Sequence, residues 1–160
     1  MIIYSWSYKI APTIDNAEEL DENDYIEIKP GKYTGLHWND GSIFLDEEPF
    51  GMLIQSIMKQ YPSFEYSSNN DIDHKTWRKI ITEFNRILLI LKNKPNIQQI
   101  NSHIGFGFDD SQTQFAKNLN QNISDMIQLI QSLINWIEKT LENNEFISIL
   151  GVPTQMFDED

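Results

Sequence analysis

Two long stretches with apolar residues at helical spacing constrain the fold more than any other feature of the chain. From Ser111 to about Asn143 such residues recur every three or four positions, and a similar stretch runs from about Asp73 to Asn93. A helix with a broad apolar stripe has to bury that stripe against another element. We therefore predict two long helices packed on each other, the later of which begins at a capping box formed by Ser111 and Gln114.

Short segments rich in β-branched and aromatic residues predict strands outside these helices. They are residues 2–10, Tyr25–Ile28 and the "FISIL" segment at 146–150. The second segment ends at Pro30-Gly31, a pair that favours a turn. The last segment follows the longest predicted helix, and we expect it to return to the same sheet as the others.

The stretch "GLHWNDGSIFLDEEPF", residues 35–50, predicts a hairpin that runs into a helix. Asp40-Gly41 between apolar runs is typical of a two-residue type I′ turn. That turn would pair Trp38 with Ile43 and His37 with Phe44. In this register His37 and Asp46 are diagonal neighbours on the outer face of the hairpin.

A third helix is expected directly after the hairpin. Asp46 is placed as its N-cap, and apolar residues at helical spacing continue to Tyr61, before Pro62. The chain as a whole is predicted to be a single α+β domain, residues 1–160. Its small, mainly antiparallel sheet would contain N-terminal strands, a hairpin and one C-terminal strand, packed against about three helices of which the last is long.

The charge is unevenly distributed along the chain. The net charge is −12, and residues 15–48 carry eleven carboxylates against two lysines. Residues 73–94 carry six basic side chains against two acidic ones. We expect salt pairing between these two segments. An overall field of negative sign repels phosphate backbones and attracts cationic partners, so direct binding of nucleic acid is not expected.

Three constellations of residues suggest chemistry, and a structural interpretation is favoured for each. His37 with nearby carboxylates such as Asp46 could form a general base with its orienting group, but no nucleophile is recognisable beside them. The three histidines are far apart in the sequence, so no metal site is expected. Gly105-Phe106-Gly107 has an aspartate at position 110, where a dinucleotide loop has its third glycine, and we interpret it as a turn before the last helix. No catalytic residue and no cofactor is therefore predicted.

The sequence also indicates where the protein acts. There is no cysteine, no secretion signal at the N-terminus, and no apolar run long enough to span a bilayer. These features predict a cytoplasmic protein that does not associate with membranes.

The chain resembles the bacterial immunity proteins of polymorphic-toxin and contact-dependent growth-inhibition systems. The resemblance is carried by the acidic run at 15–27, by "LDEEPFGMLI" at the predicted helix start, and by the closing "WIEKTLENNEFISILGV". It spans most of the chain as a general pattern. It implies a non-catalytic protein that binds the C-terminal domain of a cognate toxin, a basic and nuclease-like domain, in a 1:1 complex.

If the resemblance holds, an acidic surface with aromatic anchors would contact the toxin. The candidate contact residues are Asp21, Glu22, Asp24, Tyr25, Glu27, Tyr33, Asp40, Phe44, Glu47 and Glu48. Two alternatives remain open. One is an adaptor domain that uses its amphipathic helices, for example to form a homodimer, and the other is an enzyme whose site converges on His37 and nearby carboxylates.

Overall fold

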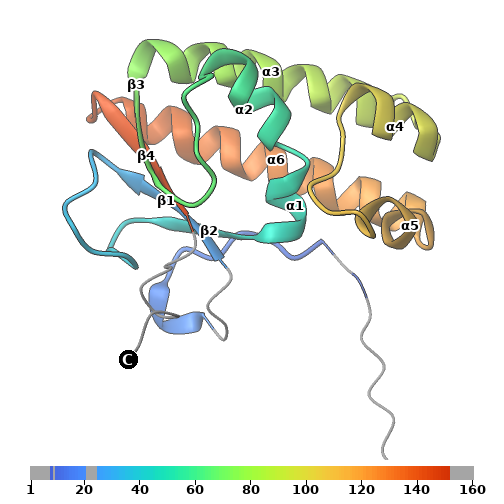
Figure 1. Ribbon diagram of the computed structural model, residues 1–160, viewed down its shortest axis with the longest axis horizontal. Coiled ribbons are helices and arrows are strands. Elements are labelled where there is room, and N and C mark those ends of the chain that lie inside the picture. Colours follow the sequence, from blue (N-terminus) through green and yellow to red (C-terminus); the bar gives the residue numbers. More distant parts are fainter. Residues whose placement is uncertain (1–7, 9, 21–24, 152–160) are drawn as a thin grey trace, which may run out of the picture.

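The computed structural model describes residues 8, 10–20 and 25–151, and it has the α+β architecture that the sequence predicts (Figure 1). Four strands form one antiparallel sheet in the order β2-β1-β4-β3. Their bounds are β1 Tyr25–Pro30, β2 Ile43–Asp46, β3 Asn69–Asp73 and β4 Phe146–Leu150. The strands β1 and β4, which lie far apart in the sequence, are therefore neighbours at the centre of the sheet.

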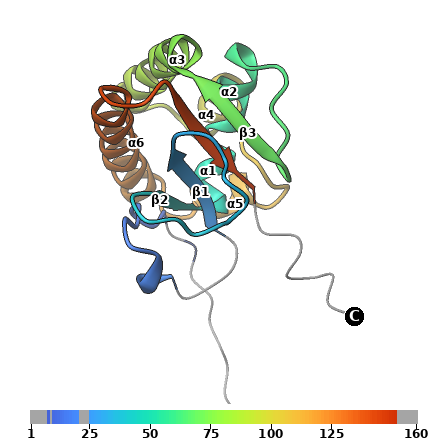
Figure 2. The same cartoon turned by 90° about the vertical axis from the view of Figure 1, so that its left-hand side faces the viewer.

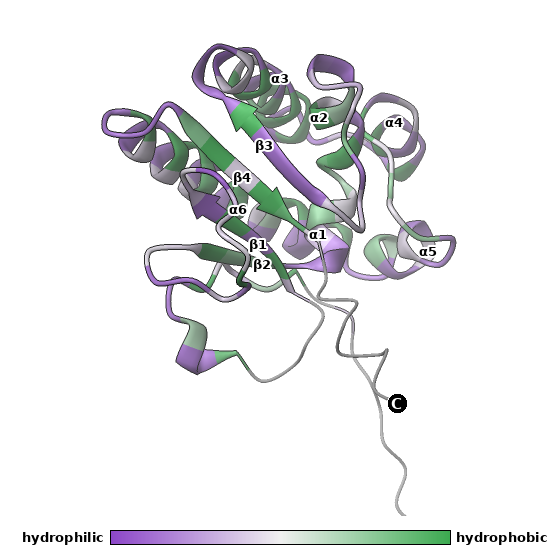
Figure 3. Ribbon diagram, turned by 60° about the vertical axis from the view of Figure 1, so that its left-hand side comes forward, coloured by the Kyte–Doolittle hydropathy of each residue, from purple (hydrophilic) through white to green (hydrophobic). Residues whose placement is uncertain are grey.

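The two faces of the sheet differ in what they contact. Alternate residues such as Ile26, Ile28, Ile147 and Ile149 are buried in the main hydrophobic core with the helices. Figure 3 shows the helices on one side of the sheet. The other face, here called the outer face, carries Glu27 and its neighbours in the sheet, and it is the face on which the candidate site lies.

Seven helical segments accompany the sheet in the described part of the chain. They are the 3-10 helix η1 Ala17–Glu19 and the α-helices α1 Glu47–Gly51, α2 Ile54–Gln60, α3 His74–Lys92, α4 Ile97–His103, α5 Ser111–Ala116 and α6 Leu119–Leu141. The long helices α3 and α6 pack side by side, as predicted (Figures 1 and 2). The fully buried Trp77 of α3 ties this layer to the sheet, because its indole nitrogen donates to the carbonyl of Ile147 at 2.9 Å.

The predicted continuous helix from Ser111 to Asn143 is wrong at one point, where it breaks into α5 and α6. Asn118 has φ −141° and ψ 58°, outside the helical region. The buried side chain of Asn122 donates to the carbonyl of Phe115 at 3.1 Å and so takes the place of the interrupted helical bond. The predicted capping box at Ser111 is not formed either, because the N-cap residue of α5 is Asp110. Ser111 lies inside the helix, and its hydroxyl donates to Glu48 at 2.6 Å.

The predicted helix from Asp46 to Tyr61 is also broken, between α1 and α2. Asp46 is the N-cap residue, as expected, but its side chain makes no cap hydrogen bond. The first segment ends at Gly51, whose backbone lies against the backbone of Gly107. A Cβ on Gly51 would be 2.8 Å from the Cα of Gly107, so glycine is required at this approach. The Gly105-Phe106-Gly107 segment therefore has a packing role.

Two elements were absent from the sequence prediction. Residues 69–73, for which no strand was predicted, form the edge strand β3. The Asn70 side chain is buried and bonds the carbonyls of Glu65 and Ser68 and the backbone amide of Glu65, which explains how a polar segment enters the sheet. The short helix α4 starts at a capping box formed by Asn96 and Gln99.

The predicted hairpin within residues 36–45 does not form. A turn is present at Asp40-Gly41, but Asp40 does not have the positive φ that a type I′ turn requires. Ile43–Asp46 pairs instead with β1, which places Glu27 opposite Phe44. The predicted pairing of His37 with Phe44 is therefore wrong, and residues 31–42 form a long connection between β1 and β2.

The predicted strand at residues 2–10 lies mostly outside the described residues. Ile10, which is described, is buried in the core. Further along, Ile14 forms a two-hydrogen-bond bridge to Phe44 on the outer edge of β2. Within the described ranges, no helix has both the length and the apolar character needed to cross a bilayer.

Candidate functional site

The candidate site is the outer loop, residues 31–42, which leaves β1 and returns as β2. It contains no helix or strand. It lies on the outer face of the sheet, away from α3 and α6 (Figures 2 and 3). A loop of this length without regular structure is uncommon in a small domain and is often functional.

A buried carboxylate anchors the second half of the outer loop. Glu27 is 1% exposed and projects from β1 to the outer face. Its carboxylate accepts hydrogen bonds from the backbone amides of Trp38 and Asn39, the latter at 2.8 Å. It also accepts from the Asn39 side chain at 3.0 Å and from the Ser42 hydroxyl at 2.6 Å. Because donors surround this anion, its burial stabilises one conformation of the loop.

A second set of contacts anchors the first half of the outer loop. The carboxylate of Asp71 on β3 accepts from the backbone amide of Tyr33 at 3.0 Å and from the hydroxyl of Ser148 at 2.6 Å. The ammonium of Lys29 donates to the carbonyls of Pro30 and Lys32 at 2.9 and 3.0 Å. Strands β1, β3 and β4 thus all hold this half of the loop.

The loop contains a strained backbone position. Trp38 has φ +63°, a backbone conformation that residues other than glycine adopt at a cost of about 1–2 kcal/mol. The two hydrogen bonds to Glu27 from the amides of Trp38 and Asn39 hold it there. Strain that is maintained by surrounding structure is concentrated at functional sites, so it marks this loop as a candidate.

The outer loop presents an apolar side chain and two charged ones to solvent. Leu36 is 69% exposed, and the charged residues Asp40 and Lys32 are also exposed. Behind them the rings of Tyr33 and His37 meet edge to face, with centroids 5.6 Å apart. The His37 Nε2 atom lies 3.2 Å from the carbonyl oxygen of Gly151. The exposed groups are therefore carried by a loop whose backbone is fixed.

Three predicted contact residues are corrected by their burial. Glu27 and Phe44 are 1% and 0% exposed, and Tyr25 is 7% exposed. Glu27 and Tyr25 point to the outer face beneath covering segments, and Phe44 lies between β1 and the bridge to Ile14. These three residues support the site from inside the protein, and a partner that binds the surface does not contact them.

The other predicted contact residues have different positions. Asp40 is exposed and Tyr33 is half-buried in the outer loop. Glu47 and Glu48 are half-buried at the start of α1, where Glu47 accepts a hydrogen bond from the Tyr66 hydroxyl and Glu48 accepts one from Ser111. These two carboxylates thus connect α1 to other segments. The remaining predicted contacts, Asp21, Glu22 and Asp24, lie outside the described residues.

Sequence reasoning missed the exposed leucine and the strained residue of the site, Leu36 and Trp38, because it placed this stretch in a hairpin. Three further carboxylates, Asp15, Glu18 and Glu19, are exposed on or beside η1, which follows the Ile14 bridge to the free edge of β2. An exposed leucine in a predicted strand has no local signal, because its exposure depends on how the loop is anchored.

The predicted pairing of His37 with Asp46, on which a general base was based, is not present in the structure. His37 was expected beside Asp46, but it contacts the Tyr33 ring and the Gly151 carbonyl, while Asp46 lies opposite Tyr25 in the sheet. Within the described residues, no group of three or more histidine, aspartate or glutamate side chains is arranged to hold a metal ion.

The basic helix α3 makes ion pairs different from those expected. Arg86 and Lys59 both pair with Glu83, at 3.2 and 3.4 Å. Arg78 faces Glu138 of α6 at 3.9 Å. These described pairs use carboxylates of the helical layer, and the expected pairing with the acidic segment 15–48 is replaced by them.

A comparison with known protein families, with curated proteins and with solved structures found no match to this chain.

Proposed function

We propose that the protein is a non-catalytic immunity protein that binds and neutralises a cognate toxin domain through the outer loop and the acidic residues beside it. The observation that carries the proposal is the buried Glu27 carboxylate, which fixes a strained loop so that Leu36 and Asp40 face solvent. A loop that is ordered before binding loses little conformational entropy in the complex, which favours affinity.

The partner that fits this surface is a basic protein domain. Among the described residues Asp15, Glu18, Glu19 and Asp40 are exposed, Lys32 is the exposed cation of the outer loop, and the net charge of the chain is −12. Negative charge around an apolar side chain steers a cationic partner and excludes others. A toxin with a basic substrate cleft, such as a nuclease, has that charge. The proposed complex is 1:1 and forms in the cytoplasm, where such a toxin acts.

The test is a protection assay with the C-terminal domain encoded by the gene immediately upstream. That domain is expressed in cells with and without this protein, and the tagged pair is purified at low and high salt. We expect growth arrest that this protein relieves, and a complex that weakens as salt rises. A toxic domain that this protein neither binds nor neutralises would contradict the pairing.

Two matched variants locate the surface. Leu36→Asp places a charge in the proposed interface, and Leu89→Asp makes the same change on α3 at a residue of almost equal exposure, 66% against 69%. We expect only the first to lower protection. The double variant Glu22→Lys with Asp24→Lys tests the acidic residues of the sequence prediction, and unchanged binding would remove them from the proposed surface.

A further inference from the structure

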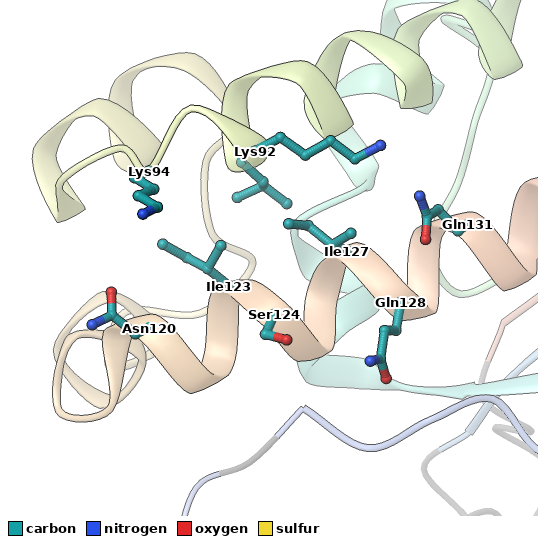
Figure 4. A pocket seen from close by; sticks show the side chains of 9 residues that line it. Lys92, Lys94, Asn120, Ile123, Ser124, Ile127, Gln128 and Gln131 are labelled. Carbon is teal, nitrogen blue, oxygen red and sulfur yellow. The ribbon is translucent and has the colours of Figure 1, made fainter.

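The antiparallel helices α3 and α6 leave an open groove at one end of their contact. Its volume is about 670 Å³, within the range of roughly 300–1,000 Å³ that is usual for ligand sites. The half-buried Ile127 of α6 and the exposed edge of the core residue Ile123, which is 7% exposed, form an apolar floor, and Lys92 and Lys94 stand on the α3 side (Figure 4). No carboxylate is among the residues that line it. The groove is therefore a positive and apolar site in a chain with strong negative charge.

At the opposite end of the same helix pair, a carboxylate pairs with a basic side chain, whereas the groove has no such carboxylate. There Arg78 of α3 faces Glu138 of α6 at 3.9 Å. Seven residues earlier, on nearly the same face of α6, stands Gln131, and Lys92 extends toward it (Figure 4). An amide thus occupies the position at which a carboxylate would neutralise the lysine. The lining leaves the negative charge to be supplied by a ligand.

The backbone conformation of Lys94 is a second, independent indication that the groove binds a negatively charged group. Lys94 has φ +53° just after α3 ends, and its amide donates to the carbonyl of Leu91 at 3.2 Å. Glycine is the usual residue for this cap because it adopts positive φ without strain. The helix dipole favours lysine near this end and accounts for Lys92. The helix dipole does not explain why a lysine occupies the strained cap position. The side chain of Lys94 lies over the groove beside Ile123 and Asn120 (Figure 4).

The shape and lining identify the class of occupant. The groove runs between two helices, as do grooves that accept an amphipathic helix. Its lining has no aromatic ring on which a nucleobase could stack. We propose that this groove docks an acidic amphipathic helix of a partner protein, with aliphatic side chains on Ile123 and Ile127 and carboxylates beside Lys92 and Lys94.

The proposed site is separate from the outer loop, which lies on the far side of the sheet (Figure 1). Its test uses a fluorescein-labelled synthetic peptide of about 15 residues, long enough for several helical turns, with leucines at helical spacing flanked by glutamates. The control peptide has glutamine in place of each glutamate. We expect saturable binding of the acidic peptide to the whole protein by fluorescence anisotropy, and at least about tenfold weaker binding of the control. Equal binding of the two peptides, or none, would overturn the proposal.

Paired variants and NMR place the peptide on the molecule. Lys92→Glu with Lys94→Glu should weaken binding by about tenfold or more, while Lys75→Glu with Lys79→Glu, which makes the same charge change earlier on α3, should have little effect. The methyl resonances of Ile123 and Ile127 should shift on titration. Equal loss of binding in both double variants, or shifts confined to other residues, would contradict the site. Decanoate that shifts these methyls when the acidic peptide does not would assign the groove to a small amphipathic anion and overturn the choice of a helix.

Discussion

The buried carboxylate of Glu27 accepts a hydrogen bond from the backbone amide of Trp38, and Trp38 itself has φ +63°. A charge in the sheet and a strained residue in the outer loop thus depend on each other. The anion is satisfied only when the loop is in place, and the loop holds its strained conformation because the anion binds its amides.

The first prediction concerns this pair. Glu27→Gln places an amide NH₂ group among donors and removes the charge, so we expect the free energy of unfolding to fall by about 2–4 kcal/mol. Urea denaturation measures it. Asp40→Asn makes the same chemical change at an exposed residue of the loop and should stay within about 0.5 kcal/mol of the wild type. Equal stability of the two variants would mean that the Glu27 contacts do not hold the loop.

The strained cap at Lys94 predicts a stabilising substitution. Lys94→Gly should raise the free energy of unfolding by about 1 kcal/mol, because glycine adopts φ +53° without the steric cost. Lys94→Ala keeps that cost and should leave stability near the wild-type value. Thermal unfolding of the three proteins separates the backbone effect from the loss of the side chain. Stabilisation by alanine as large as that by glycine would argue against strain at this residue.

The contact between Gly51 and Gly107 predicts sensitivity to a single methyl group. A Cβ on Gly107 would lie 2.7 Å from the Cα of Gly51, so Gly107→Ala should destabilise the fold by about 1–3 kcal/mol. Chemical denaturation with Phe108→Ala, at an exposed neighbour, gives the comparison. A Gly107→Ala protein as stable as the wild type would show that the two segments separate easily.

Glu83 predicts a loss of stability in acid. Burial opposes its ionisation, but hydrogen bonds from Arg86, Lys59 and Gln60 outweigh burial and hold the pKa of Glu83 below its ordinary value. A carboxyl whose pKa is lower in the folded state stabilises the fold above its unfolded pKa. This contribution should be lost as pH falls from about 4.3 through the folded pKa.

Urea midpoints between neutral pH and acid measure this dependence on pH. Glu83→Gln should lower stability at neutral pH and make the acid part of the profile shallower. Glu142→Gln removes one carboxyl from an exposed position and serves as the control. A Glu83→Gln profile parallel to that of the wild type would mean that Glu83 does not contribute to the acid response.

The fold class and the long helices could be predicted because their signals are local. The start of α3 at Asp73, with its side chain accepting from the Thr76 amide, follows from the order of residues. So do the apolar stripes of α3 and α6 and the strand at 146–150. For such segments, burial of one face and backbone hydrogen bonding agree with each other.

The positions of the helix breaks, the strand β3 and the candidate site depended on residues far apart in the sequence. Gly51 ends α1 against Gly107, and Asn70 enters the sheet through the backbone of residues 65–68. The Asp40-Gly41 pair does form a turn, but the Asn39 amide, which would close the hairpin, donates to Glu27. The sequence by itself thus determined the two long apolar helices, the strands at 25–28 and 146–150, and where the charge lies. Only the tertiary structure decided which carboxylate is buried and which leucine is exposed, because both depend on contacts that no local pattern records.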